Sequence, residues 1–359
     1  MKYDDIHFNC NIIDGYNKTF NFIQSARSTG KTTDILRKAY KYFTKFNKPS
    51  LIIRRNIVDI TEQYVDDLAK VINKFIDDEN LKIKFFYKSS NLSNGIVDIY
   101  TTEADLKNKI RPFIRMIALS KKMQSLKGGV LDNVGLIIYD EYIIDIYNGE
   151  KYLPNEVLKF KEIYNTYQRE STCLKCYFLG NIYSVFNPFH EWKNIPYDKI
   201  SDGCILSGDD WIYNKYKLHP ALRAELLKNP LYKDDPAYTD YALNGIAVND
   251  LNKIIVQRLP QNYKMAYLFK TQNKWIAVYR CSLYQGQEFL YWAGEINWNP
   301  EYARLSMCFD FANLGINSFI PDRETILRLL PLKYAIMNRS IAYDNIGTSY
   351  TLEYLYSFF

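Results

Sequence analysis

Residues 19–37 read Thr-Phe-Asn-Phe-Ile-Gln-Ser-Ala-Arg-Ser-Thr-Gly-Lys-Thr-Thr-Asp-Ile-Leu-Arg, an apolar strand that turns through small residues into a helix. The stretch 25–32 fits the phosphate-binding loop G-x-x-x-x-G-K-[ST] at every fixed position except the first, where Ser25 replaces glycine. In such a loop, backbone N–H groups and a helix N-terminus converge on an anion, Lys31 reaches the outer phosphates, and the Thr32 hydroxyl ligates Mg²⁺. The flanking strand and helix favour a nucleotide site over a chance glycine turn.

The sequence therefore predicts that the loop and the first helical turn bind ATP and Mg²⁺. The predicted cofactor-binding residues are Ser25, Ala26, Arg27, Ser28, Thr29, Gly30, Lys31, Thr32 and Thr33. Within the loop, Arg27 is also a candidate contact for the γ-phosphate; the alternative is a solvent-exposed loop arginine.

The bulk composition is that of a soluble globular protein. The 359 residues suit two or three domains, and 47% hydrophobic with 24% charged residues excludes a disordered chain. A net charge of +6 permits a polyanionic partner without demanding one. No stretch has the apolar length of a membrane span and the N-terminus lacks a signal-peptide pattern, so we expect a cytoplasmic protein. The C-x-x-C of Cys173 and Cys176 has no second pair nearby, which favours buried reduced thiols over zinc.

Short β-rich runs alternate with helical runs from residue 19 to about 190, which indicates an α/β sheet with crossovers. The expected strands are Phe20–Gln24, Leu51–Arg55, Lys82–Tyr87, Ile96–Tyr100, Arg115–Leu119, Leu136–Tyr139 and Cys176–Leu179, with 82–100 forming a hairpin. The expected helices are Lys31–Phe46, Val58–Asp77 and Asn155–Tyr167. This pattern predicts a P-loop NTPase domain over residues 1–200.

The pattern of predicted helices and strands changes after residue 200. Short helices at Ala221–Lys228 and Pro236–Leu243 predict a helical lid or linker over 201–260. From 261 to 359 the chain is β-rich again, with strands at Lys274–Arg280, Phe289–Ala293 and Ser340–Tyr343 and helices at Glu324–Leu330 and Leu352–Phe358. We therefore expect a smaller α+β C-terminal domain.

A pair of acids follows a buried-type strand in Val134-Gly-Leu-Ile-Ile-Tyr-Asp140-Glu141. At the carboxyl end of a strand, Asp140 is placed to orient water on Mg²⁺, and Glu141 to act as the general base for the attacking water. The alternative is a solvated acidic turn. A glutamate beside the aspartate favours hydrolysis over nucleotide sensing.

Three further polar residues are candidates for the reaction. Asn181 ends a downstream strand and is as compatible with a γ-phosphate or water contact as with an ordinary turn. Arg169 follows a helix and, as an edge arginine, is a candidate to stabilise transition-state charge on a neighbouring subunit; Lys127 lies on a glycine-flanked loop. Both have the alternative of being surface residues.

With these motifs in this order, the chain resembles the genome-packaging ATPases of small, phi-29-like podophages. The stretches that carry the likeness are residues 21–31, Ile138-Tyr-Asp-Glu-Tyr, Tyr152-Leu-Pro-Asn-Glu-Val157 and Gly180-Asn-Ile-Tyr-Ser-Val-Phe-Asn-Pro188. The likeness covers residues 15–190 well and is only suggestive in the C-terminal third. Its departure from the family pattern is Ser25, which puts the loop geometry in question.

The resemblance implies an ATP-driven ring, usually of five subunits, that docks on the portal of an empty capsid, in some cases through a phage-encoded RNA, and drives double-stranded DNA inward. In that scheme Lys31 and Thr32 bind phosphate and Mg²⁺, Asp140 holds the metal water and Glu141 is the catalytic glutamate. Arg169 and Lys127 match the residues that act on the neighbour's ATP, and Asn181 matches the sensor. These roles are expectations from the resemblance.

The resemblance also implies an RNase H-like C-terminal domain that no longer cleaves DNA. The strand 274–280 contains no acid, and Glu295, Asp310 and Asp344 show no recognisable spacing, whereas nuclease chemistry needs acids that converge on metals. Candidate contacts for DNA phosphates are Arg54, Arg55, Lys121 and Lys122, and for each of them a structural role or simple exposure is an equal alternative. Alternatives to the motor are another P-loop translocase or helicase, a packaging motor with an active nuclease, and a nucleotide-gated structural protein without turnover.

Overall fold

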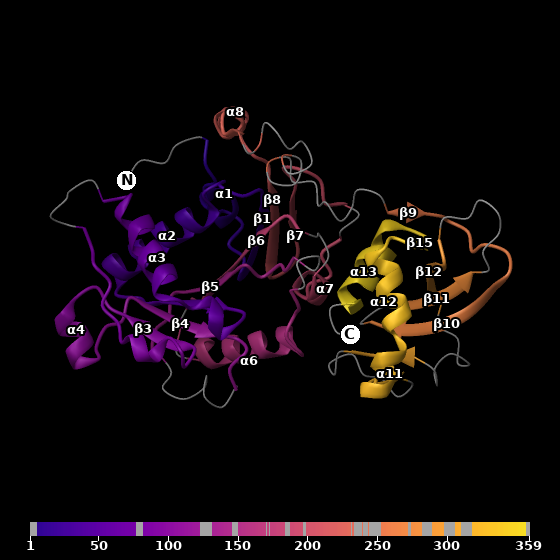
Figure 1. Cartoon of the computed structure of the whole chain (residues 1–359). Helices are drawn as coiled ribbons and strands as arrows, with labels where there is room; N and C mark the ends of the chain where they lie inside the picture. The colour runs from indigo at the N-terminus through magenta and orange to yellow at the C-terminus, as the bar shows by residue number, and fades with distance from the viewer. Residues whose placement is uncertain are drawn as a thin grey trace. The chain divides into compact units, whose positions relative to one another are not determined.

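The computed structural model describes two compact units. It covers residues 6–76, 82–122, 131–145, 150–169, 171, 173–183, 187–196, 199–230, 232, 239, 243, 253–271, 274–281, 289–297, 306–309 and 318–356. The first unit comprises residues 1–143, 159–182 and 200–246, and the second comprises residues 144–158, 183–199 and 247–359 (Figure 1). The predicted boundaries at residues 200 and 260 stay a prediction.

The first unit is built on an eight-stranded sheet with the order β3-β4-β2-β5-β6-β1-β8-β7. Its strands are β1 (Phe20–Ser25), β2 (Ser50–Arg54), β3 (Ile96–Ile99), β4 (Ile114–Ala118), β5 (Leu136–Asp140), β6 (Lys175–Asn181), β7 (Ile205–Ser207) and β8 (Trp211–Tyr216). Only the outer pairs β3–β4 and β7–β8 are antiparallel. The predicted α/β class with a mainly parallel central sheet is confirmed.

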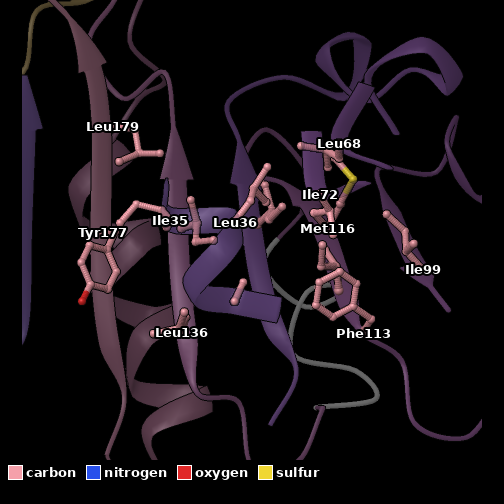
Figure 2. Close-up of a cluster of buried hydrophobic side chains, with 14 of the residues drawn as sticks. Ile35, Leu36, Leu68, Ile72, Ile99, Phe113, Met116, Leu136, Tyr177 and Leu179 are labelled. Carbon is pink, nitrogen blue, oxygen red and sulfur yellow. The ribbon is translucent and has the colours of Figure 1, made fainter. Parts of the chain in front are cut away.

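Successive side chains of the central strands point to opposite faces of this sheet, as the two-residue period of a strand requires. One face packs on α2 (Lys31–Phe46) and α3 (Glu62–Asn73), and Figure 2 shows Ile35, Leu36, Leu68 and Ile72 from these helices among the strand side chains. The other face meets α6 (Glu156–Gln168), where the rings of Phe160 and Phe178 lie 4.8 Å apart. Burial on both faces explains why the strands read as continuous apolar runs.

Two of the three helices predicted before residue 200 agree closely with the structure, and the third, α3, is shorter at both ends than the predicted Val58–Asp77. Helix α2 spans the predicted residues, and α6 differs from its prediction by one residue at each end. Helix α3 begins later than expected, because the Thr61 side chain caps it by accepting the backbone N–H of Tyr64, after a short 3₁₀ turn at Ile57–Asp59. The described residues before 250 also form α1 (Asn11–Asp14), α4 (Glu103–Asn108), α7 (Pro188–Trp192) and α8 (Pro220–Leu226), and a further 3₁₀ turn lies at Ser89–Asn91.

Two sequence predictions differ from the structure. Residues 82–87 do not form a strand; the described part makes one antiparallel bridge, between Phe86 and Tyr100, and the Asn73 side chain takes both backbone hydrogen bonds of Ile83 at 2.9 Å. Residues 205–216, assigned to the helical lid, instead form β7 and β8 of the first sheet. Of the lid helices, α8 is present, and 236–243 lies largely outside the described residues.

The second unit contains a seven-stranded sheet with the order β14-β13-β10-β11-β12-β15-β9. Its strands are β9 (Ile254–Ile255), β10 (Tyr263–Lys270), β11 (Trp275–Cys281), β12 (Tyr291–Ile296), β13 (Ser306–Met307), β14 (Ser318–Phe319) and β15 (Ile341–Tyr343). Strands β10, β11 and β12 are antiparallel, and β13 lies parallel to β10, which agrees with the predicted RNase H-like α+β class.

Three helices cover one face of the second sheet, namely α11 (Arg323–Arg328), α12 (Leu330–Met337) and α13 (Ile346–Tyr356). Their buried side chains, including Leu332 and Leu352, form a core with Phe269 and Ile276 of the strands. None of the helices in the described part of the chain is both long and apolar enough to cross a membrane.

Candidate functional site

The candidate site begins with the turn between β1 and α2. Strand β1 ends at Ser25 and α2 begins at Lys31, so the loop delivers its backbone N–H groups to a helix N-terminus. Ser28 and Gly30 have positive φ angles of 62° and 85°. Glycine at position 30 adopts this conformation without strain, and it also makes room for His7, whose Cβ would lie 3.3 Å from an added Cβ.

Hydroxyl groups brace the loop at the position where the glycine of the motif is missing. Ser25 Oγ lies 2.6 Å from Thr29 Oγ1 and donates to the Ala26 carbonyl at 3.0 Å. Both side chains are almost fully buried, at 0% and 1% exposure. Hydrogen bonds across the loop therefore accommodate Ser25 at the position where the motif has glycine.

The segment before β1 also supports the loop. The backbone N–H of Phe8 donates to the Thr29 carbonyl at 2.8 Å, and that of Cys10 donates to Asp34 Oδ2, in α2, at 2.6 Å. The buried ring of Phe8 stands edge-on to Tyr216 of β8, with centroids 5.4 Å apart. No sequence motif marked this segment as part of the site.

Lys31 and Asn181 meet directly across the sheet. Strands β1 and β6 are parallel neighbours with Ser25 paired to Asn181, so the carboxyl ends of both strands meet at one edge. There Lys31 Nζ donates to Asn181 Oδ1 at 2.7 Å. Burial lowers the pKa of Lys31 to about 8; the charge of Arg27 adds to the lowering, while those of Asp140 and Glu141 oppose it.

The acidic pair ends β5, which is the other neighbour of β6. Asp140 is buried, whereas the Glu141 side chain is 57% exposed. Glu141 has a φ of +57°, a left-handed conformation that is uncommon outside glycine and concentrates at functional sites. Gly180 permits this turn to approach β6, because an added Cβ would come within 2.8 Å of Tyr142 and 2.7 Å of Ile143.

Two buried arginines at the end of β2 hold the acidic pair. Arg54 donates to Asp140 Oδ2 at 3.1 Å and to Glu141 Oε2 at 2.6 Å. Arg55 donates to the carbonyls of Glu141 at 3.1 Å and Tyr142 at 2.8 Å, which stabilises the left-handed turn. Of the two alternatives for Arg54 and Arg55, the structure supports the structural role over DNA contact: their side chains are buried within the first unit, where they bind the acidic turn.

Another residue that sequence reasoning missed is Tyr64, whose hydroxyl donates to Asp140 Oδ2 at 2.7 Å. The only sequence signal for Arg54 and Arg55 is their position, directly at the carboxyl end of the strand that pairs with β5. Tyr64, 76 residues from Asp140, has no such signal.

The other predicted site residues have different outcomes. Thr32 and Thr33 lie partly exposed in the first turn of α2, and Arg27 is exposed on the loop. Arg169 is exposed, one residue beyond the end of α6. Lys127 lies outside the described residues. The structure thus brings the loop, Lys31, the acidic pair and Asn181 together at one edge of the sheet.

The donor set at this edge suits Mg²⁺. The hydroxyl of Thr32 and the carboxylate of Asp140 are the hard oxygen donors that Mg²⁺ prefers, and this ion usually takes only one or two protein ligands in addition to phosphate and water. Within the described ranges, no group of three or more His, Cys, Asp or Glu side chains could hold a metal ion.

The acids of the second unit are closer together than the sequence suggested. The Glu295 backbone N–H donates to Asp344 Oδ2 at 2.9 Å, so these two are neighbours rather than scattered. The Glu295 carboxylate is ion-paired with Lys274 at 2.9 Å, and Asp310 lies outside the described residues. Strand β10 contains lysines and no acid.

Comparisons with known proteins agree with this geometry. A family model described as podovirus DNA encapsidation protein (Gp16) matches residues 3–202. The DNA packaging proteins of Bacillus phages PZA and phi29 are each 27% identical over 188 residues, which cover 50% of this chain and 48% of theirs. The chain therefore spans about half the length of the curated relatives it matches.

Two solved structures share the fold over nearly the whole chain. The Phi-28 gp11 DNA packaging motor has a TM-score of 0.64 at 14% identity and covers 99% of this chain and 98% of its own. The bacteriophage Phi-29 viral genome packaging motor assembly has a TM-score of 0.59 at 20% identity, covering 99% and 100%. At these identities the likeness establishes the fold.

Proposed function

The chain belongs to the podovirus DNA encapsidation protein (Gp16) family, and from that premise we propose that it is an ATP-hydrolysing motor that moves double-stranded viral DNA into a preformed capsid. One observation carries the proposal: Lys31, Asn181 and the acidic pair meet at the carboxyl ends of β1, β6 and β5. This is the edge where ligands bind in open α/β sheets. The relatives' description as DNA packaging proteins supports the transported substrate.

Each residue at this edge has a role in the proposed hydrolysis. Residues 25–33 bind the phosphates, with Lys31 and Arg27 on the outer ones, and Thr32 and Asp140 hold Mg²⁺. Bound Mg²⁺ neutralises phosphate charge. Glu141 accepts a proton from water as the water oxygen attacks the γ-phosphorus and ADP leaves. Asn181 senses whether a γ-phosphate is bound, through its hydrogen bond with Lys31.

The assembly is proposed as a homomeric ring, with five subunits as the expected number. In such a ring Arg169, which is exposed, acts together with Lys127 on the ATP of the neighbouring subunit, where an arginine stabilises transition-state charge. The ring docks on the capsid portal in the host cytoplasm, either directly or through a phage-encoded RNA. The second unit serves this docking and DNA contact, and it cuts no DNA. With Arg54 and Arg55 removed from the candidates, Lys121 and Lys122 remain for sequence-independent phosphate contacts.

Phosphate release by the purified full chain tests the proposal. Glu141→Gln is expected to reduce the Mg²⁺-dependent hydrolysis rate at least about 100-fold while keeping ATP binding, because it removes only the base. Lys31→Ala is expected to lose binding. Glu103→Gln, on the exposed surface of α4, is the matched control and keeps full activity. An unchanged rate in Glu141→Gln would refute turnover at this site and favour a nucleotide-gated structural protein.

Two DNA measurements separate the remaining alternatives. Double-stranded DNA is expected to stimulate hydrolysis, and packaging into cognate capsids is expected to stop in the Glu141→Gln variant. Cutting of plasmid by the wild-type protein with Mn²⁺ would instead establish a motor with an active nuclease. Unwinding of a duplex without packaging would establish a helicase.

A further inference from the structure

Tyr64 makes a contact that the proposed reaction does not yet use. Its hydroxyl donates to Asp140 Oδ2 at 2.7 Å, and Arg54 donates to the same oxygen at 3.1 Å. Neither bond uses Asp140 Oδ1. Both hydrogen bonds to the Asp140 carboxylate are therefore made through Oδ2. They fix the orientation of the carboxylate, and Oδ1 stays available as a ligand for Mg²⁺.

Both donors come from the two ends of one short connection. Arg54 is the last residue of β2, and Tyr64 lies in the first turn of α3. The connection is itself ordered: the side chains of Asn56 and Asp59 cap its 3₁₀ turn reciprocally, and Thr61 caps α3 at the Tyr64 backbone N–H. The Tyr64 ring therefore has a defined position relative to the strand that precedes it.

Arg54 fixes Tyr64 in addition to Asp140. Its guanidinium lies over the Tyr64 ring, 4.7 Å from the centroid. The same guanidinium and the Tyr64 hydroxyl therefore approach Asp140 Oδ2 from one connection of the chain. A neutral phenol and a cation together satisfy one carboxylate oxygen.

We propose that Tyr64 is a positioning residue: by binding Oδ2 it orients the Asp140 carboxylate, so that Oδ1 would be the oxygen left to hold Mg²⁺. The inference rests on the proposed function, because it takes Asp140 as the metal residue. Groups that hydrogen-bond a metal-binding carboxylate orient it, and their loss typically weakens metal binding by about 10- to 100-fold. Tyr64 therefore acts on the Mg²⁺-dependent part of nucleotide binding.

The test is Tyr64→Phe in the full chain, with a fluorescent non-hydrolysable ATP analogue titrated at a series of Mg²⁺ concentrations. We expect the Mg²⁺ concentration for half-maximal binding enhancement to rise about tenfold, with the affinity in EDTA unchanged within about twofold. The Mg²⁺-dependent increase in melting temperature with the analogue is expected to shrink in parallel. Tyr64→Met, which keeps most of the volume, gives the same comparison if the Phe variant is unstable.

The matched control is Tyr177→Phe. Tyr177 is also buried and donates its hydroxyl to an aspartate, Asp14, at 2.6 Å, but it does not touch the acidic pair. Its loss is expected to leave the Mg²⁺ titration unchanged. Equal Mg²⁺ titrations for wild type and Tyr64→Phe would overturn the inference, as would an equal loss of affinity with and without Mg²⁺. A wild-type chain that binds no nucleotide at any Mg²⁺ concentration would overturn the proposed function, and this inference with it.

Discussion

Arg54 and Glu141 form the shortest link between β2 and the acidic pair, with Arg54 Nη2 2.6 Å from Glu141 Oε2. The other terminal nitrogen of the same guanidinium lies 3.1 Å from Asp140. Two adjacent carboxylates repel each other, and a planar cation with separate donors compensates both at once. In the proposed hydrolysis, Glu141 exchanges part of this ion pair for a water molecule.

Replacement of this guanidinium is expected to destabilise the protein. In Arg54→Met the buried Asp140 loses its cation, and we expect the free energy of unfolding to fall by about 2–3 kcal/mol, less than for a fully buried pair because Glu141 is exposed. Urea unfolding followed by circular dichroism measures the change. Lys107→Met, which breaks the exposed ion pair with Glu103, is expected to cost under about 0.5 kcal/mol. Equal costs for the two variants would contradict the assigned role.

Nucleotide affinity is expected to fall at alkaline pH. Lys31 has a pKa of about 8, lowered by burial, and only its protonated form attracts phosphate. Bound phosphates raise this pKa, so binding takes up a proton, and affinity falls as the pH passes above about 8. We expect about tenfold weaker binding at pH 9 than at pH 7, as measured by fluorescence titration with an ATP analogue.

The control for this pH dependence is Lys31→Arg. A guanidinium stays protonated across this range, so the variant is expected to bind more weakly but with an affinity that does not vary between pH 7 and 9. A wild-type affinity that is equally flat would show that Lys31 does not titrate in this range.

The hydroxyl brace across the loop is expected to show coupling in a double-mutant cycle. Ser25→Ala and Thr29→Val each remove one member of a buried pair at 2.6 Å, and the double variant leaves no buried hydroxyl without its partner. We expect the sum of the two single costs to exceed the double cost by about 0.5–1.5 kcal/mol in urea unfolding. Strictly additive costs would mean that the two hydroxyls do not support each other.

The role of Arg169 between subunits has its own experiment. Arg169→Ala and Glu141→Gln subunits, each inactive alone, are mixed and assayed for phosphate release. We expect the mixture to recover part of the activity, because some interfaces then combine an intact Glu141 with an intact Arg169 of the neighbour. A mixture of Arg169→Ala with Lys31→Ala subunits is expected to recover in the same way. If no ratio restores hydrolysis, Arg169 does not act across the interface.

Much of this site could be predicted from the sequence, because the apolar and helical patterns showed that its motifs follow strands or begin a helix. The run from β1 into α2 and the acids after β5 are local patterns, and parallel pairing brings their carboxyl ends together. The sequence could not decide between DNA contact and a structural role for Arg54, because its burial against Asp140 depends on which strand lies beside β5. The order of the strands in the sheet is a long-range property that no local pattern contains.

The same reason explains the errors in the fold. Residues 82–87 have strand-like composition, but the amide of Asn73, a helix residue, takes the bonds of Ile83 that a neighbouring strand would take. Residues 205–216 were assigned to a lid because the downstream helices dominated the local signal. Their pairing with β1, almost 200 residues earlier in the chain, makes them part of the sheet instead.

The support that Phe8 gives to Thr29 bears on how the first unit can be excised for study. A shortened chain that starts at β1 would contain every recognisable motif. It would still lose the backbone hydrogen bond from Phe8 to the loop and the His7 side chain that lies against Gly30. Expression boundaries for this unit should therefore be placed upstream of His7, even though the first recognisable signature lies well inside them.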